Sequence, residues 1–204
     1  MRNLLICAVI VLTGGCSSSS LVNMWKDPSF QQQPLSKVLV IGVRKDPVRR
    51  RLWEDTFASE LTAHNVAATA SYTLFPNALP DTQQAVEAIR TNGFDGVLVS
   101  RRLQPLANLQ YVPGYTTTDP VTRYDAWANR YYTMFQEVDH PSYVDTEKVA
   151  RHSVDVWTTG KGGKLVWSGT TETVDPSSPQ MVQHNVVNAV ISELSDQGII
   201  PKGQ

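Results

Sequence analysis

The stretch Lys37-Val38-Leu39-Val40-Ile41-Gly42-Val43 is an uninterrupted apolar run rich in β-branched residues. Runs of this kind are typical of a central strand in a sheet that is covered on both faces. Asp46 and Pro47 follow closely, as an N-cap and a first-turn proline do where a helix begins. The stretch therefore predicts a strand followed by a helix, which is the repeating unit of an α/β fold.

The same alternation of strand and helix patterns continues to residue 100. Apolar residues at helical spacing, from Leu52 to Leu61, carry the first helix to about residue 64. Weak alternation at 66–75 predicts a second strand, a capping-box start at Asp81 predicts a second helix over 81–92, and 96–100 reads as a third strand. The order to this point is β-α-β-α-β.

The last part of the chain predicts a hairpin and a helix. Residues 148–159 and 164–174 alternate in polarity on either side of the turn sequence 160–163. Ser178 and Pro179 begin a helix that ends near Gly198. The predicted fold is an α/β class with a mixed sheet: β-α-β-α-β, a β-hairpin and a C-terminal helix in one compact domain over 37–204. A Tyr-rich insertion at about 104–147 interrupts it, with a strand expected at 131–138.

The N-terminus has the pattern of a bacterial export signal. Arg2 precedes an apolar run at 4–12, which is too short to span a membrane, and Gly14-Gly15 leads to Cys16. This ending resembles the lipobox of bacterial lipoproteins, whose cysteine is acylated after cleavage. The resemblance implies a signal peptide at 1–15 and a lipidated tether at 16–36. The mixed composition of 21–36 indicates that the tether either docks partly on the domain through Trp25 or is a flexible linker. Ser17 follows the cysteine where Asp would favour the inner membrane, which implies the outer membrane, facing the periplasm.

Composition limits the classes of function. The chain has 204 residues, of which 41% are hydrophobic and 18% charged, so it can bury a core and is not a disordered tail. A net charge of −1 argues against a general nucleic-acid binder. Cys7 leaves with the signal and Cys16 carries lipid, so we expect no disulfide.

Two stretches, 37–55 and 163–171 with the helix that follows, resemble a family of uncharacterised bacterial lipoproteins. The globular part of that family is similar to the N-terminal domain of TolB and to the curli-secretion lipoprotein CsgG. The resemblance implies the fold and the compartment, and it leaves the function open.

Catalytic and metal motifs are missing from the sequence. His64, His140, His152 and His184 do not stand at metal-binding spacing, and we expect His152 to be a core or edge residue of its strand. The segment 160–164 resembles a phosphate loop but leads into a strand, so we interpret it as a hairpin turn. We therefore predict no catalytic residue, no metal, no cofactor and no enzyme activity.

Two other groups of residues are candidates for binding. Five arginines near predicted strand ends either hold an anionic partner or form a solvated face beside Glu54 and Asp55: Arg49, Arg50, Arg51, Arg101 and Arg102. The insertion carries aromatic rings that either bind a partner or cover an exposed sheet face: Tyr111, Tyr115, Tyr124, Trp127, Tyr131 and Tyr132.

The leading interpretation is a non-enzymatic outer-membrane lipoprotein that binds a protein or another envelope partner through 104–147, and no nucleic acid. The alternatives are a subunit of a ring or secretion-type assembly, an activator of a cell-wall enzyme, and a small-molecule binder.

Overall fold

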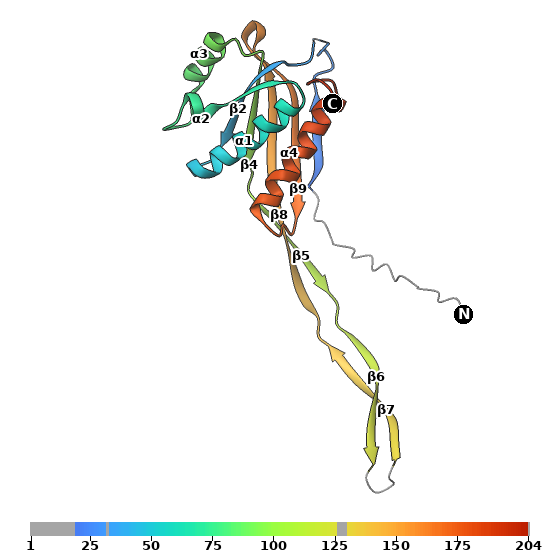
Figure 1. The fold of residues 1–204 in the computed structure, drawn as a ribbon. Helices are drawn as coiled ribbons and strands as arrows, with labels where there is room; N and C mark the ends of the chain where they lie inside the picture. The colour runs from blue at the N-terminus through green and yellow to red at the C-terminus, as the bar shows by residue number, and fades with distance from the viewer. Residues whose placement is uncertain (1–18, 32, 126–129, 204) are drawn as a thin grey trace, which may run out of the picture.

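The computed structural model describes residues 19–31, 33–125 and 130–203. Figure 1 shows a globular part, which holds the helices, and a long two-stranded arm that extends away from it. The elements in chain order are β1 (Ser19–Lys26), β2 (Lys37–Val43), α1 (Pro47–Ala63), β3 (Ala67–Ala70), α2 (Ser71–Leu74), α3 (Thr82–Asn92), β4 (Gly96–Arg102), β5 (Leu106–Val112), β6 (Tyr115–Asp125), β7 (Arg130–His140), β8 (Tyr143–Thr158), β9 (Lys164–Val174) and α4 (Pro179–Asp196).

A seven-stranded mixed sheet forms the base of the globular part. Its strand order is β1-β9-β8-β4-β2-β3. The seventh strand, β5, lies outside this order and pairs with β8. Strands β3, β2 and β4 are parallel, whereas β4, β8, β9 and β1 are antiparallel neighbours. The predicted class, a mixed α/β sheet with a C-terminal helix, is confirmed.

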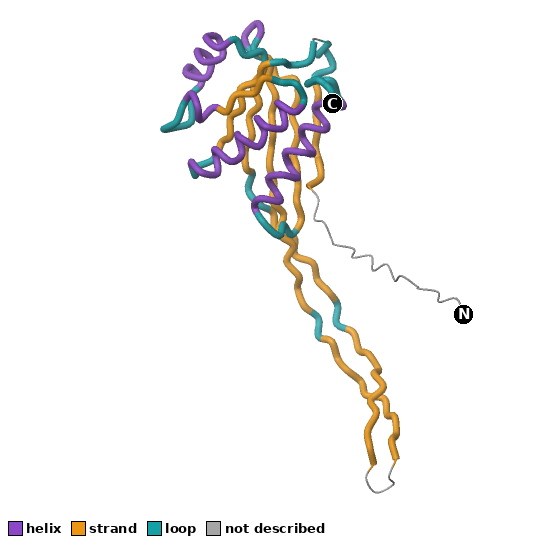
Figure 2. Tube along the Cα trace, in the orientation of Figure 1, coloured by secondary structure: helices purple, strands orange, loops and turns teal. Residues whose placement is uncertain are grey.

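Both faces of β2 are covered, which explains its uninterrupted apolar sequence. Val38 and Val40 belong to the larger core cluster, together with side chains of α1 and α4. Leu39 lies on the other face with Phe94 and Val97, against which Ile89 of α3 packs. Figure 2 shows α1 and α4 side by side across one face of the sheet.

The predicted helix ends have the expected capping contacts. The Asp46 side chain accepts hydrogen bonds from two backbone N–H groups in the first turn of α1. Asp81 and Gln84 form a capping box at α3, and Gly93 ends that helix in the left-handed region at φ 65°. Ser178 caps α4 by accepting one hydrogen bond, from the backbone N–H of Met181. These side chains satisfy N–H groups that a helix leaves without internal partners.

The strand predicted at 66–75 was wrong in its second half. Strand β3 ends at Ala70, and residues 71–74 form the single turn α2. The chain turns here because Glu54 accepts hydrogen bonds from the Ser71 hydroxyl and the Tyr72 backbone N–H. Residues 71–74 therefore form a turn with buried polar contacts, although their weak alternation predicted a strand.

The hairpin expected at 148–174 is present as β8 and β9, joined through a short 3₁₀ turn at 160–162. Strand β8 begins earlier than predicted, at Tyr143, because its first half continues into the arm. Val154 and Val156 face the large core, as the alternation predicts.

Part of the segment assigned to the tether is a strand. Residues 19–26 form β1, which pairs antiparallel with β9 at the edge of the sheet. Trp25 belongs to this strand and is 47% exposed. An ion pair between Lys164 and Asp27 fixes the chain just after β1. The free leash that we expected at 16–36 is therefore shorter by the length of this strand.

The insertion forms the arm, which we define as residues 106–147. It consists of a ladder between β5 and the first half of β8, followed by a second ladder between β6 and β7. Pro113 and Pro141 lie at the break between the two ladders, where they donate no backbone N–H. A Cβ atom on Gly114 would lie 2.8 Å from the carbonyl oxygen of His140, so glycine permits this close crossing.

Candidate functional site

The arm exposes large apolar side chains along its length. Tyr131 is 74% exposed, Leu109 72% and Phe135 71%. More than a third of the side chain is also exposed at six other apolar residues of the arm: Leu106, Tyr111, Tyr115, Met134, Tyr143 and Val144. Large exposed apolar patches are unusual on a monomeric protein and mark interaction surfaces.

The ladder register shows which of these residues share a face of the arm. Pro120 lies opposite Phe135, and Val121 lies opposite Met134, one position further along β6. Residues directly opposite one another in an antiparallel ladder lie on the same face, and successive residues alternate between faces. Both faces of the β6–β7 ladder therefore carry apolar side chains.

The structure places three of the six predicted binding rings in detail. Tyr111 lies on β5, Tyr115 on β6 and Tyr131 on β7. The Tyr115 ring stacks on His140 with a centroid distance of 4.5 Å. All three belong to the arm, so they do not cover a face of the globular part (Figure 1).

The other three predicted rings are those of Tyr124, Tyr132 and Trp127. Tyr124 lies within β6 and Tyr132 within β7. Trp127 is outside the described residues.

The arm is acidic. Residues 106–147 contain six Asp and Glu residues and two Arg residues, so their net charge is −4. The whole chain has a net charge of only −1, so positive charge is concentrated in the globular part. A surface that combines aromatic rings with acidic groups suits a basic or apolar protein surface better than a phosphate-bearing one.

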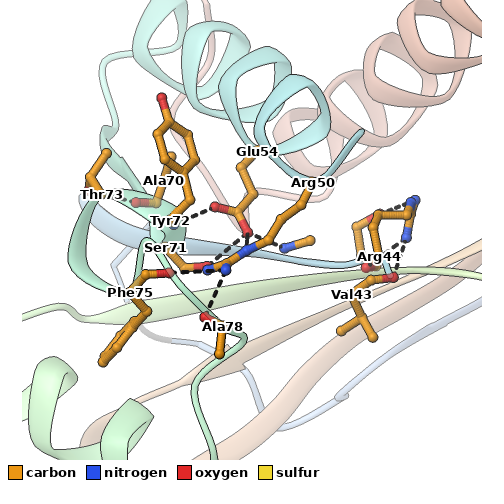
Figure 3. Close-up of polar contacts among 12 residues, drawn as sticks. Val43, Arg44, Arg50, Glu54, Ala70, Ser71, Tyr72, Thr73, Phe75 and Ala78 are labelled. Atoms are coloured by element: carbon orange, nitrogen blue, oxygen red, sulfur yellow. Dashed lines mark hydrogen bonds and ion pairs between the residues drawn. The ribbon is translucent and has the colours of Figure 1, made fainter. Parts of the chain in front are cut away.

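A buried polar clasp lies at the carboxyl ends of β2 and β3 (Figure 3). Glu54 and Arg50, one helical turn apart on α1, form an ion pair at 2.9 Å with side-chain exposures of 0% and 6%. Arg50 also donates to the backbone carbonyls of Phe75 and Ala78 and to the Ser71 hydroxyl. The clasp therefore ties α1 to the segment that follows β3.

Gly42 completes the clasp from the strand. Its backbone N–H donates to Glu54 Oε1 at 2.9 Å. A Cβ atom at this position would lie 3.1 Å from Glu54 Cγ, so a larger residue would push the carboxylate away. The glycine in the apolar run is thus explained by the close approach of a charged side chain.

The five arginines predicted to bind an anion make different contacts in the structure. Arg50 is buried in the clasp, so that part of the prediction was wrong: its charge is already paired with Glu54. Arg101 forms an ion pair with Asp155 at 2.5 Å. Arg51 lies over the Tyr72 ring at 5.6 Å.

The two remaining arginines of that group, Arg49 and Arg102, are exposed. The structure adds a sixth arginine to them, Arg44, which the sequence analysis did not single out. The sequence feature that could have identified Arg44 is its position directly after the apolar strand β2, which places its side chain at the end of the sheet.

The ring of Trp53 contacts both His152 and Arg44 at this end of the sheet. Its ring stacks on the imidazole of His152 at a centroid distance of 4.7 Å and an interplanar angle of 30°. The Arg44 guanidinium lies 4.5 Å from the Trp53 ring centre. His152 is only 4% exposed, which confirms its prediction as a core residue, and its burial lowers its pKa to about 3, helped by Arg44 and Arg102.

Two of the surface cavities formed by the described residues lie beside helices. One, of about 520 Å³, lies between α2 and α3 and includes Leu74 and Phe75 in its lining. The other, of about 330 Å³, lies between α1 and α4 beside His64 and His184.

Other sequence predictions concern Cys16, metal binding and the membrane. Cys16 lies outside the described residues. Among the described residues, no three His, Cys, Asp or Glu side chains gather as metal ligands would. In the same part of the chain, no helix has the length and apolar character that crossing a membrane requires.

Comparison with known proteins gives similarity in structure only. No family model and no curated protein matches the sequence. A PelC dodecamer from Paraburkholderia phytofirmans is 16% identical, with a TM-score of 0.46, over 90% of this chain and 99% of that one. Lipoprotein GNA1162 from Neisseria meningitidis is 14% identical, with a TM-score of 0.41, over 79% and 99%.

A third similar structure is a PDZ domain protein from Parabacteroides distasonis, at 9% identity and a TM-score of 0.37 over 88% and 37% of the two chains. At such identities and TM-scores, none of these three proteins indicates what this chain binds. The predicted resemblance to TolB and CsgG stays a prediction.

Proposed function

We propose that this chain is a non-enzymatic, lipid-anchored envelope lipoprotein that binds a protein partner through its arm. The observation that carries the proposal is the exposed apolar surface on both faces of the β6–β7 ladder. An isolated two-stranded ladder is only marginally stable in water. A partner that buries these side chains would stabilise the arm and make it a binding element.

The arm lies outside the folding core, which fits a binding role. Neither core cluster contains a described residue between 106 and 147. The cores come instead from β2, β4, β8, β9 and the helices of the globular part. Selection for stability of the globular part therefore does not account for the arm or for its exposed rings.

The non-enzymatic part of the proposal is supported by the chemistry at the sheet end. In α/β folds, ligands and substrates bind outside the carboxyl ends of the parallel strands. Here the acidic group at that place, Glu54, already accepts four hydrogen bonds from Gly42, Arg50, Ser71 and Tyr72. A carboxylate held in this way is a structural group. Activity profiling of the chain from residue 16 onward tests this part of the proposal.

The anchor is proposed from Cys16 and the apolar run before it, and Ser17 favours the outer membrane, with the arm in the periplasm. Palmitate labelling of cells that express the natural chain is expected to label it, and Cys16→Ser is expected to remove the label. A natural chain that stays unlabelled would rule out the anchor without affecting the arm.

The binding role is tested with the double variant Tyr131→Ala, Phe135→Ala. After chemical cross-linking in cells, we expect the partner that co-purifies with the natural chain to be lost. Both side chains are exposed, so the midpoint of thermal unfolding is expected to change by less than about 2 °C. A matched control, Val86→Ala with Leu79→Ala, removes exposed apolar side chains from the globular part and should keep the partner. Retention of the partner by the arm variant would contradict the proposal.

A ring or secretion-type assembly is the second candidate, because the β6–β7 ladder is a separate two-stranded sheet whose outer edges are unpaired within the described chain. Open edges of this kind accept strands from another molecule. Light scattering of the detergent-extracted protein separates the two candidates, since an assembly predicts a mass several times that of one chain. The cell-wall enzyme activator stays a prediction.

A further inference from the structure

Two arginines and a histidine come together where β2 and β4 end. Arg44 follows the last residue of β2, and Arg102 is the last residue of β4. These strands are parallel, so their carboxyl ends meet at the same edge of the sheet. His152 lies opposite Arg102 in the ladder between β4 and β8, which places both residues on the same face.

Neutral groups hold Arg44 in place. Its Nη1 donates to the backbone carbonyls of Val43 and Ser100, at 2.9 and 3.2 Å, and its Nη2 donates to the Ser100 hydroxyl at 3.4 Å. The ring of Trp53 packs against the guanidinium. The position of this charge is therefore fixed without a carboxylate.

The positive charge of this cluster is not compensated. Across the described part of the chain, the carboxylates that form ion pairs do so with residues other than Arg44 and Arg102. Burial, and secondarily the charge of Arg102, lowers the pKa of Arg44 to about 10, which still leaves it protonated at neutral pH. Arg102 is close enough to lower the pKa of Arg44, so the two guanidinium groups repel each other, and an anion bound between them would offset that repulsion.

His152 gives the cluster a second unusual feature. Its Nδ1 atom is buried and has no hydrogen-bond partner among the described residues. Buried polar atoms are normally hydrogen-bonded, and an exception calls for an explanation. The imidazole is neutral and buried beside the cluster, so the two guanidinium groups supply the N–H donors that an oxyanion needs.

The fold places this cluster at the same end of the sheet as the proposed anchor. Leu21, Thr171, His152 and Arg102 form one row across β1, β9, β8 and β4. Neighbouring strands lie about 4.8 Å apart, so the row is roughly 15 Å long. Ser19 lies two residues beyond the row in β1, and Cys16 is at most about 10 Å further along the chain. A lipid on Cys16 would hold this edge close to the membrane surface.

We infer that Arg44 and Arg102, which lie beside His152, bind the phosphate of a lipid headgroup in the membrane that carries the anchor. Arginine pairs with phosphate through parallel N–H donors, and Arg102 is exposed at the mouth of the cluster. Lys45 and Arg49 are also exposed and add positive charge to the surface around it. The choice of a lipid rests on the proposed acylation, whereas the choice of a phosphate rests on the side chains alone.

The test uses the chain from residue 16 onward with Cys16→Ser, so that no acyl group contributes to membrane binding. Its affinity is measured by sedimentation with vesicles of phosphatidylcholine containing 30% phosphatidylglycerol, and with vesicles of phosphatidylcholine alone. We expect binding that depends on phosphatidylglycerol, and a loss of at least tenfold in Arg44→Gln, Arg102→Gln. If the double variant does not fold, the single variant Arg102→Gln is used in its place, because it removes only an exposed side chain.

The matched control is the double variant Arg90→Gln, Lys202→Gln. It also removes two positive charges from the globular part, but away from the cluster. An equal loss of binding in this control, or no dependence on phosphatidylglycerol, would overturn the inference. Inorganic phosphate at 10 mM provides a further arm, read by the NMR signals of His152. If phosphate shifts the His152 signals of a protein that does not bind the vesicles, the site binds free phosphate. That result would overturn the proposal of a lipid headgroup.

Failure of this inference is distinguishable from failure of the proposed function. The vesicle experiment uses a chain without an acyl group, whereas palmitate labelling and the arm variants do not involve Arg102.

Discussion

At the residue scale, His152 couples the stability of the globular part to pH. Its pKa is about 3 in the folded chain and returns to an ordinary value near 6.5 on unfolding. Below pH 6.5 the unfolded chain takes up a proton that the folded chain does not, so stability is lost as the pH falls from about 6.5 towards 3. The cause is burial first, and the nearby arginines second.

We therefore predict that the free energy of unfolding falls by about 2 kcal/mol between pH 7 and pH 5 through this one residue. In His152→Phe, which keeps an aromatic ring against Trp53, that part of the pH dependence is expected to disappear. Urea denaturation of both proteins at the two pH values measures the difference. An unchanged pH dependence in the variant would show that His152 is not the group responsible.

The clasp gives a second prediction at this scale. Glu54→Leu would leave the Arg50 guanidinium buried without its carboxylate, and breaking a buried ion pair from one side costs about 3–5 kcal/mol. Arg50→Met combined with Glu54→Leu removes both charges and should recover much of that loss. Arg49→Ala, one residue away and exposed, is the control and should change stability by less than about 0.5 kcal/mol. Similar losses from Arg49→Ala and Glu54→Leu in urea denaturation would contradict this role of the clasp.

At the element scale, strands with buried faces were predictable and exposed ones were not. β2 and β4 are covered on both sides, so their apolar runs follow directly from burial. In the arm both faces of the ladder are exposed, so Thr, Tyr and Pro replace the alternation that identifies a half-buried strand. Of the strands of the arm, only 131–138 of β7 was predicted, and β1, at an exposed edge, lies in the segment predicted as a tether.

The candidate site was predictable to a similar extent. Tyr111, Tyr115 and Tyr131 could be predicted because tyrosine is enriched in recognition surfaces, whichever fold carries it. The sequence could not assign roles to the arginines, because charge alone does not distinguish Arg50, paired inside the clasp, from Arg102, exposed beside His152. Arg44 was missed since its role depends on Trp53, which only the fold brings next to it.

The arm also gives a prediction about folding. Replacing residues 113–142 by Asn-Gly joins Val112 to Tyr143, which are already paired, through a two-residue turn that suits a hairpin. Because the arm contributes no described residue to either core, the thermal midpoint of the globular part is expected to stay within about 2 °C. Calorimetry checks this, and a large decrease would mean that the arm is part of the folding unit.

At the scale of the whole molecule, the arm begins at the same end of the sheet as the proposed anchor. The strands from residue 106 to residue 125 have a length of about 65 Å at 3.3 Å per residue. The anchor would leave Ser19 within about 10 Å of the lipid, so the reach of the protein comes from the arm and not from a leash. This arrangement limits the arm to partners at the membrane or within about one arm length of it.

Photo-cross-linking in living cells tests the central claim, that the arm binds a protein, most directly. A photoreactive amino acid replaces Phe135 on the arm in one strain and Val86 on α3, which is 58% exposed, in another. Illumination is expected to link the chain at 135 to one defined protein, identified by mass spectrometry, while the chain at 86 yields no such product. Equal products at both positions, or none at 135, would contradict the account.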